Sequence, residues 1–431
     1  MLNIFVDHIS PRLIYTLQFV LGNRGVDYQL CNDYIQFQQL EGIKFNYSER
    51  HFDHVLQLKP STLLFEETIE EYEISTALFF QEECFSFNEV VDPLASIFFT
   101  LSRMEEYLTD EKDSLGRFPG KKSLLYKYGW HEKAMCDRWS IDFLYYLKSQ
   151  CGLHWHSKLE LVDCVPTFDI DNAYAYLHKN QIRTKLATAK DYLYNRKDRL
   201  SDRKKVLAGE MKDPYDTYEF IQTLSMTGAK MTIFWLLGDY GTYDKNISHQ
   251  HPAQRKLIKK MSECAEIGIH ASYGANDSEY QLLSEIQRLT EITETDVRKN
   301  RQHFLMLNLP ITYQALIRQK ITDDYTMGYA DIAGFRAGTA RPYPWFDLHR
   351  NDTTSLTIHP FSYMDGTLKE YLNLTPNEAK VKIAELFREV CQHGGQFSYI
   401  WHNETIGDYA HWKGWKDVFT YTFNLNQADF I

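Results

Sequence analysis

The chain has 431 residues, of which 44% are hydrophobic and 24% charged, as in globular proteins with enough apolar content for a core. Its 47 basic and 58 acidic side chains give a net charge of −11, which argues against nucleic acid as a partner.

The termini and cysteines bear on the compartment. The N-terminus lacks the basic and apolar regions of a signal peptide, and no apolar stretch approaches a membrane span. The seven cysteines include no CxxC pair, which argues against a disulfide framework and a structural zinc site and favours a reducing compartment. We therefore expect a cytoplasmic protein.

Residues 1–155 are predicted to form an α/β accessory domain. Short strand-like runs occur at residues 3–6 and 34–37, and residues 92–108 have helical spacing with a proline near the start. Arg103 lies close to two glutamates in this segment, and we expect a structural ion pair at the domain junction. No catalytic constellation is evident in this part.

Residues 156–431 are predicted to form a distorted (β/α) barrel of about seven strands, because strand and helix patterns alternate along them. The strands are expected at 161–168, 230–237, 267–272, 297–305, 334–337, 356–360 and 397–401, and the helices at 253–264, 278–294 and 377–392. Residues 179–205, which carry ten Lys or Arg and three Asp, should form helices above the barrel mouth. Such a run is either a solvated helical face or a patch for an anionic group or a partner.

Two carboxylates, Asp169 and Asp171, follow the apolar strand predicted at 161–168. In barrels of alternating strands and helices, catalytic groups gather at the carboxyl ends of the strands. We expect the two carboxylates to differ in environment and role, one holding a metal and the other free as a base. The alternative is an ordinary strand-to-loop turn.

Four later segments repeat this arrangement, each with a titratable or cationic side chain just past a strand-like run. They are residues 266–273 with His270, 334–345 with Arg336, 356–365 with His359 and Asp365, and 397–404 with His402. A single coincidence of this kind carries little weight, whereas five in series point to a shared active site.

In order and content these segments resemble the five motifs of the polysaccharide deacetylase (NodB-homology) family of carbohydrate esterases, in a divergent branch with an extra N-terminal domain. The resemblance spans roughly residues 160–425 and implies a distorted barrel that binds a divalent metal. It matches Asp169 to the general base and matches Asp171 and His270 to metal ligands. The family's second metal histidine should follow four residues after His270, but that position is Gly274.

The resemblance also implies roles for residues near the later strands. Arg336 matches the arginine that orients the base, His402 matches the catalytic histidine, and Asp365 is expected behind His402. His359 has no counterpart in the family motifs, and Pro360 follows it, so we expect His359 to be structural.

A divalent metal, expected to be zinc, needs at least one protein ligand beyond Asp171 and His270. His303 is the candidate because it ends the next predicted strand, where it can reach the same mouth, and Asn276 is a weaker choice. Arg301 shares a strand face with His303. The alternative is that His303 is a core residue and that Asp171 and His270 only hydrogen-bond.

Together these assignments predict a metal-dependent hydrolase that removes acetyl groups from an N-acetylated sugar or polysaccharide. The metal would polarise the acetyl carbonyl, Asp169 would deprotonate the attacking water, and His402 would protonate the departing amine. The alternatives are an O-acetyl esterase, which needs His402 less, and a sugar-binding protein without turnover. The aromatic residues expected to contact the sugar are Tyr273, Tyr343, Trp345 and Trp401.

Overall fold

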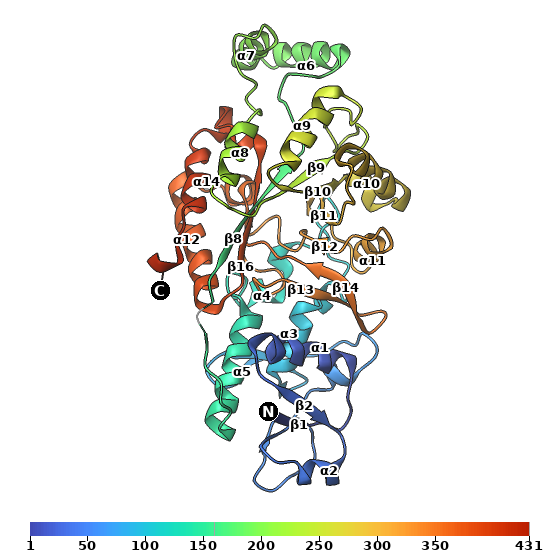
Figure 1. Cartoon of the computed structure of the whole chain (residues 1–431), viewed down its shortest axis with the longest axis vertical. Helices are drawn as coiled ribbons and strands as arrows, with labels where there is room; N and C mark the ends of the chain where they lie inside the picture. Colours follow the sequence, from blue (N-terminus) through green and yellow to red (C-terminus); the bar gives the residue numbers. More distant parts are fainter. Residues whose placement is uncertain (159, 431) are drawn as a thin grey trace.

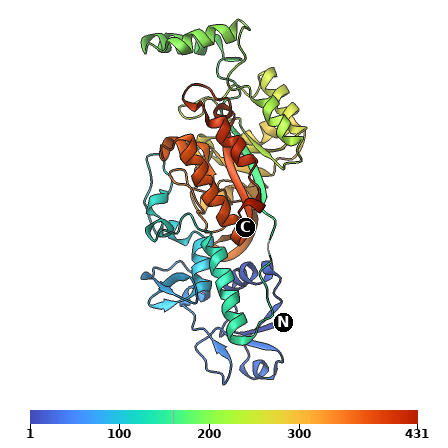
Figure 2. The ribbon, with the colours of Figure 1, turned by 90° about the vertical axis from the view of Figure 1, so that its left-hand side faces the viewer.

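The structure is a computed structural model that describes residues 1–158 and 160–430. The molecule is elongated, with the N-terminal part at one end and two helices standing off at the other (Figures 1 and 2). None of the helices in the described ranges is long and apolar enough to cross a membrane. All seven cysteines lie in these ranges, and each is a free thiol.

The N-terminal part combines a parallel sheet, ordered β2-β1-β3-β4, with an antiparallel sheet, ordered β5-β6-β7. Helix α3 is buried along its whole length and packs against α1, α5 and β6. The elements of this part are β1 (Leu2–Phe5), α1 (Pro11–Val20), β2 (Tyr28–Cys31), α2 (Tyr34–Gln39), β3 (Ile43–Asn46), β4 (Leu56–Gln57), β5 (Ile74–Leu78), β6 (Glu83–Phe87), β7 (Val90–Val91), α3 (Pro93–Leu101), α4 (Leu124–Lys127) and α5 (Met135–Cys151).

Two N-terminal segments differ from the sequence predictions. The run at 34–37, predicted as a strand, lies in helix α2, because the Asp33 side chain accepts a hydrogen bond from the Gln36 N–H and caps the first turn. The helix predicted over 92–108 is shorter than expected, since α3 ends at Leu101. Arg103 has a φ of 57°, a left-handed conformation that cannot continue an α-helix.

The second part is built on one sheet with the order β13-β14-β12-β11-β10-β9-β8-β16-β15. Its strands pair in parallel except for β13, which is antiparallel to β14. The strands are β8 (Asp163–Ile170), β9 (Thr232–Leu236), β10 (Glu266–Ala271), β11 (Lys299–Gln302), β12 (Asp323–Asp324), β13 (Tyr343–Asp347), β14 (Asp352–Ile358), β15 (Tyr363–Met364) and β16 (Gln396–His402).

Helices flank this sheet, with α8, α12 and α14 to the left of the strands in Figure 1 and α9, α10 and α11 to the right. The basic insertion forms α6 and α7, as predicted, above the rest of the chain. The helices are α6 (Gln181–Leu193), α7 (Lys197–Leu207), α8 (Tyr218–Ser225), α9 (Pro252–Ser262), α10 (Glu279–Thr293), α11 (Ile311–Arg318), α12 (Pro376–His393), α13 (Asn403–Ile406) and α14 (Trp415–Phe423).

The predicted alternation of strands and helices is confirmed, but the predicted distorted barrel of about seven strands is not shown, because the sheet of the described residues is not closed. Across the described residues the sheet has nine strands rather than about seven, and it ends at β13 on one side and at β15 on the other. Residues 334–337, predicted as a strand, form a turn. Gly334 has a φ of 133°, and a Cβ there would lie 2.1 Å from the His131 carbonyl oxygen, which accepts a hydrogen bond from the Phe335 N–H. This loop therefore packs on the N-terminal part instead of joining the sheet.

A buried ion cluster joins the two parts of the chain. The Glu106 carboxylate accepts hydrogen bonds from Arg336 at 2.9 and 2.6 Å and from Arg103 at 2.9 Å. None of these side chains is more than 3% exposed. Burial alone would raise the pKa of Glu106, but the two guanidinium groups lower it to about 2. The predicted ion pair at the junction is present, and Arg336 completes it.

Candidate metal centre and hydrolytic site

Parallel strand pairing brings the predicted site residues to the carboxyl edge of the sheet. His402 of β16 pairs in register with Asp169 of β8, and His270 of β10 pairs with Arg301 of β11. Asp171 lies two residues beyond Asp169, and residues two apart on a strand point to the same side. The two carboxylates therefore share one face. Their environments differ because Asp169 contacts Arg301, whereas Asp171 contacts His270 and His303.

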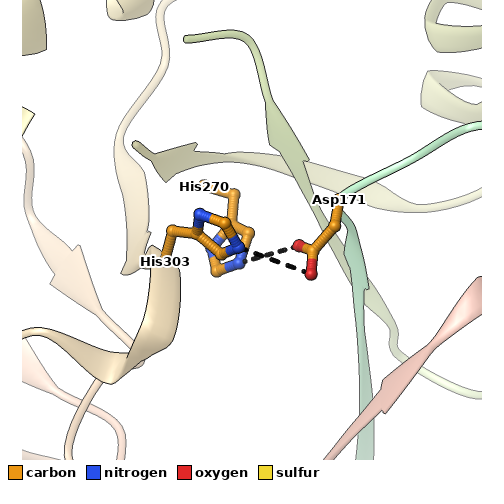
Figure 3. Close-up of side chains that lie close together, drawn as sticks. All are labelled: Asp171, His270 and His303. Carbon is orange, nitrogen blue, oxygen red and sulfur yellow. Dashed lines mark ion pairs between the residues drawn. The ribbon is translucent and has the colours of Figure 1, made fainter. Parts of the chain in front are cut away.

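Asp171, His270 and His303 form a group of potential metal ligands, and their side chains point toward one another (Figure 3). The ligand atoms all lie within 4.8 Å of one another. Asp171 Oδ1 is 3.3 Å from His270 Nε2, and Oδ2 is 3.5 Å from His303 Nε2. Both imidazoles are buried, whereas the Asp171 side chain is 28% exposed, so solvent reaches the group past this carboxylate.

Hydrogen bonds at the far nitrogens orient both imidazoles. His270 Nδ1 lies 2.9 Å from the Arg301 carbonyl oxygen, and His303 Nδ1 lies 2.8 Å from Asp244 Oδ1. Because both partners are acceptors, each neutral ring carries its proton on Nδ1 and presents the Nε2 lone pair to the centre. His270 Nε2 and Asp171 Oδ1 are buried and have no hydrogen-bond partner in the described chain. These unsatisfied atoms, with their nitrogen and carboxylate chemistry, fit a divalent metal such as zinc.

Charge attraction within the group shifts the pKa values of Asp171 and His303. Burial alone would raise the pKa of Asp171, but His303 and His270 hold that pKa well below its usual value. Burial alone would lower the pKa of His303, but Asp171 raises it to about 9. A metal ion therefore competes with a proton for His303 Nε2, and metal binding would release that proton.

Arg301 holds the carboxylate of Asp169. Its Nη1 donates to Asp169 Oδ1 at 2.8 Å, and neither side chain is more than 3% exposed. The guanidinium lies over the Phe234 ring, 4.5 Å from the ring centroid. Gly268 makes room for this ring, since a Cβ at that position would lie 2.5 Å from it. Asp169 Oδ2 remains on the side of the metal group, 3.7 Å from His270 Nε2.

The prediction that Arg336 orients Asp169 is wrong. The guanidinium of Arg336 donates to Glu106 and to the Gly328 carbonyl oxygen, and the side chain is 2% exposed. The loop that carries Arg336 packs on the N-terminal part, so this side chain does not contact Asp169. The available signal for Arg301 was its position two residues before His303, on the same strand face.

His402 stands on the other side of Asp171 and is backed by Asp365, as predicted. Its Nδ1 donates to Asp365 Oδ1 at 2.8 Å, while its Nε2 lies 3.8 Å from Asp171 Oδ2. Burial alone would lower the pKa of His402, but Asp365 raises it well above its usual value. The imidazole is therefore held in its charged form, with the Nε2–H directed toward the metal group.

Other candidate positions lie outside the metal group. Gly274 packs against Gln281, and a Cβ there would lie 2.9 Å from that side-chain amide. Asn276 donates to backbone carbonyl oxygens of its own turn. His359 has the structural role we expected, because its Nε2 lies 2.7 Å from Asp323 Oδ1.

Three of the four aromatic residues predicted to contact sugar are core residues. Tyr343 and Trp345 are 2% exposed and Trp401 is 0% exposed, so their rings offer no face to a ligand and the prediction was wrong for them. Neighbouring residues on a strand point to opposite faces, so Trp401 faces the core where His402 faces the site. Its ring packs on Phe419, with centroids 5.3 Å apart.

An aromatic wall of Tyr243, Tyr273 and Phe304 lies beside the metal group instead. Phe304 packs on the ring of His303 at 4.2 Å between centroids, and Tyr243 packs on Tyr273 at 4.4 Å. Tyr273 is partly buried, and Tyr243 is 41% exposed. The wall therefore combines a ring next to the metal group with a residue that is open to solvent.

Two acidic residues of the site were not predicted from the sequence. Asp244, which fixes His303, lies in the long loop after β9, and no local pattern separates it from other loop acids. Glu404 follows His402 by two residues, and burial raises its pKa even though His402 lies nearby. Its place at the end of β16 was the available signal.

Residues 2–152 match a family model described as a family of unknown function (DUF7033), and no curated protein matches the sequence. Similar solved structures include a protein from Mycobacterium smegmatis provisionally assigned as a polysaccharide deacetylase, with 16% identity and a TM-score of 0.40 over 63% of this chain and 88% of that one.

Two further solved structures are similar at the same level. PuuE allantoinase shows 11% identity and a TM-score of 0.37 over 61% of this chain and 85% of its own. A polysaccharide deacetylase from Bacillus cereus shows 11% identity and a TM-score of 0.30 over 61% and 86%. Similarities this weak do not assign a family or an activity, so the functional conclusion rests on the geometry of the site.

Proposed function

We propose that the protein is a metal-dependent hydrolase that removes the acetyl group from an N-acetylated sugar. The observation that carries this proposal is the meeting of three groups on one sheet edge. These are metal ligands with oriented imidazoles, a carboxylate held by an arginine, and a histidine backed by an aspartate. A sequence that resembles polysaccharide deacetylases in the same residues supports it.

Each group has a defined task in amide hydrolysis. A divalent ion held by Asp171, His270 and His303, for which we expect zinc, would supply polarisation of the acetyl carbonyl and acidification of the attacking water. Asp169, with Oδ1 held by Arg301, would accept the water proton at Oδ2.

His402 would complete the reaction by donating its Nε2 proton to the departing nitrogen. An unprotonated amide nitrogen is a very poor leaving group, so this proton is essential for N-deacetylation. Asp365 keeps the imidazole charged and fixed in orientation. An ester oxygen leaves more readily, which makes dependence on His402 a test of N- against O-deacetylation.

The aromatic wall of Tyr243, Tyr273 and Phe304 would receive the sugar ring. Aromatic faces pack well on the apolar faces of sugars, and Tyr243 is 41% exposed. We place the acetyl group toward His303, because Phe304 connects the wall to that ligand.

We further propose that residues 1–155 are an accessory domain that supports the hydrolytic part. The Glu106 cluster holds the loop around Arg336, and the Cys136 N–H donates to the Gly338 carbonyl oxygen in the same loop. Removing residues 1–155 would leave this buried guanidinium unpaired and expose an apolar junction.

Acetate release tests the activity directly. The wild-type protein should release acetate from N-acetylated chitooligosaccharides, and a chelator should abolish the release until zinc is restored. The Asp169→Asn and His402→Gln variants should each lose at least about a hundredfold in rate while keeping their fold. Metal-free wild-type protein with full activity, or activity independent of Asp169, would overturn the proposal. Loss confined to the Asp169 variant, with turnover of O-acetylated sugars, would identify an esterase instead.

A further inference from the structure

A second cavity lies between the helical insertion and the loop that follows β9. Its volume is about 1080 Å³, as large as the largest typical small-molecule sites. The walls come from residues 175–190, from α7 and from residues 238–251. None of the metal-ligand group lines it, although the loops after β8 and β9 that form its walls also carry Asp171 and Asp244. The cavity is thus distinct from the metal group.

Five cationic side chains line this cavity. The cationic side chains are Lys179, Arg183, Lys190, Arg199 and Arg203. Asp239 is the one carboxylate among the lining residues, and it pairs with Arg288 at 3.0 Å. Arg203 and Arg199 lie 2.6 and 3.8 Å from Asp191 Oδ2, so the cations of the lining that form no ion pair in the described chain are Lys179, Arg183 and Lys190.

Two of these cations are partly buried without an acidic partner. Lys179 contacts the Ala175 carbonyl oxygen, and Arg183 donates to backbone carbonyl oxygens of the loop after β9, but neither forms an ion pair within the described chain. Burial and the charge of Arg183 lower the pKa of Lys179 to about 8. A solvated helix face would leave such side chains extended into water. Here they line a concavity, where an anion would neutralise them.

The same cavity exposes apolar groups beside the cations. Ile182 and Leu186, on one face of α6, are 68% and 66% exposed, and both line the cavity. A simple inorganic anion needs no such surface, whereas the organic part of a larger ligand does. The combination fits a phosphate or carboxylate group attached to an organic moiety.

We propose that the cavity between α6 and the loop after β9 is a binding site for an organic anion of the phosphate-ester type. Lys179 and Arg183 would contact the anionic group, and the alkyl face of α6 would contact the organic part. A phosphorylated sugar and a phospholipid headgroup share this chemistry. The proposal does not depend on the hydrolytic activity, because its test measures binding alone.

The test uses the full-length protein and two probes. N-acetylglucosamine 1-phosphate is titrated by calorimetry, with N-acetylglucosamine as the neutral comparison, and vesicles of phosphatidylglycerol are compared with vesicles of phosphatidylcholine. The probe variant is Lys179→Gln/Arg183→Gln. The matched control is Lys204→Gln/Lys205→Gln, which removes the same charge from exposed positions of α7 outside the cavity. Thermal unfolding checks that each variant is folded. If Lys179→Gln/Arg183→Gln does not fold, Arg199→Gln, which removes a half-exposed cation of the cavity, replaces it.

One anionic probe should bind, and its neutral counterpart should not. We expect the cavity variant to weaken binding at least about tenfold for each cation removed, and Arg199→Gln to weaken it several-fold, while the control changes it less than about twofold. Binding of the sugar phosphate identifies a soluble ligand, and binding of the anionic vesicles identifies a lipid. Absence of binding by both anionic probes, or equal losses in the cavity and control variants, would overturn the proposal.

Discussion

Replacing Asp365 by asparagine tests the proton donor assigned to His402. Asp365 Oδ1 accepts hydrogen bonds from His402 Nδ1 and the Gly366 N–H, and Oδ2 accepts from the His402 N–H and Thr405 Oγ1. An amide offers a single acceptor oxygen, so in either orientation its NH₂ group faces two of these donors. Asp365→Asn therefore removes both the charge that stabilises the imidazolium and part of the frame that orients it.

The size of the effect follows from these contacts. A hydrogen bond to a charged group contributes about 1.5–3 kcal/mol, so losing the bond at Nδ1 and one neighbour should lower the unfolding free energy by about 3 kcal/mol or more. Loss of a correctly protonated general acid should lower kcat for N-deacetylation by about 10²–10⁴-fold. KM should change little, because the proton is needed only in the transition state.

The assay is acetate release from N-acetylated chitooligosaccharides, with denaturant unfolding measured on the same samples. Asp323→Asn is the matched control, since Asp323 makes a similar 2.7 Å contact with His359 outside the site. That variant should keep kcat within about twofold, as expected for a change away from the reacting groups. A folded Asp365→Asn protein with wild-type kcat, or an equal loss in both variants, would refute the role given to His402.

Three further predictions address the supporting residues. Arg301→Lys should lower acetate release at least about a hundredfold, because a lysine does not reproduce the planar contact with Asp169, and an unaffected rate would contradict that contact. Asp244→Asn should weaken zinc retention about 10–100-fold, because Asp244 then no longer fixes the His303 proton on Nδ1. Metal analysis after dialysis against a chelator measures this retention, and equal retention by the variant and the wild type would contradict the role of Asp244. The pKa of Glu106 is depressed from 4.5 to about 2, which corresponds to about 3 kcal/mol of stability. This contribution is complete above about pH 4.5 and is lost as the pH falls toward 2. The difference in unfolding free energy between the wild type and Glu106→Gln should therefore shrink between pH 4.5 and pH 2. A difference that does not depend on pH would contradict this prediction.

Several residues of the site could be predicted because their signal is local. Asp169, Asp171, His270 and His402 each follow an apolar strand-like run, and strand ends in parallel α/β folds converge on one edge of the sheet. His303 was predicted by the same reasoning, applied one strand further along. The helices of the basic insertion were likewise evident from composition and spacing.

Other features depend on which segments pack together. Arg301 and Arg336 both lie in segments predicted as strands, at 297–305 and 334–337, and the sequence does not show which one faces a carboxylate of the site. The N-terminal part decides this, because its Glu106 pairs with Arg336 and holds the Arg336 loop apart from the sheet. The strand predicted at 334–337 failed for the same reason.

Burial, too, was decided by tertiary structure. Trp401 and Trp345 are core residues because neighbouring strand positions alternate between faces and the adjoining helices cover one of them. Asp244 contacts His303 from the loop between β9 and α9, although the two residues are far apart in the sequence. The sequence by itself determined which chemical groups stand at the strand ends, because that depends on local pattern. Only the tertiary structure decided how those groups are paired, because pairing depends on contacts between residues far apart in the chain.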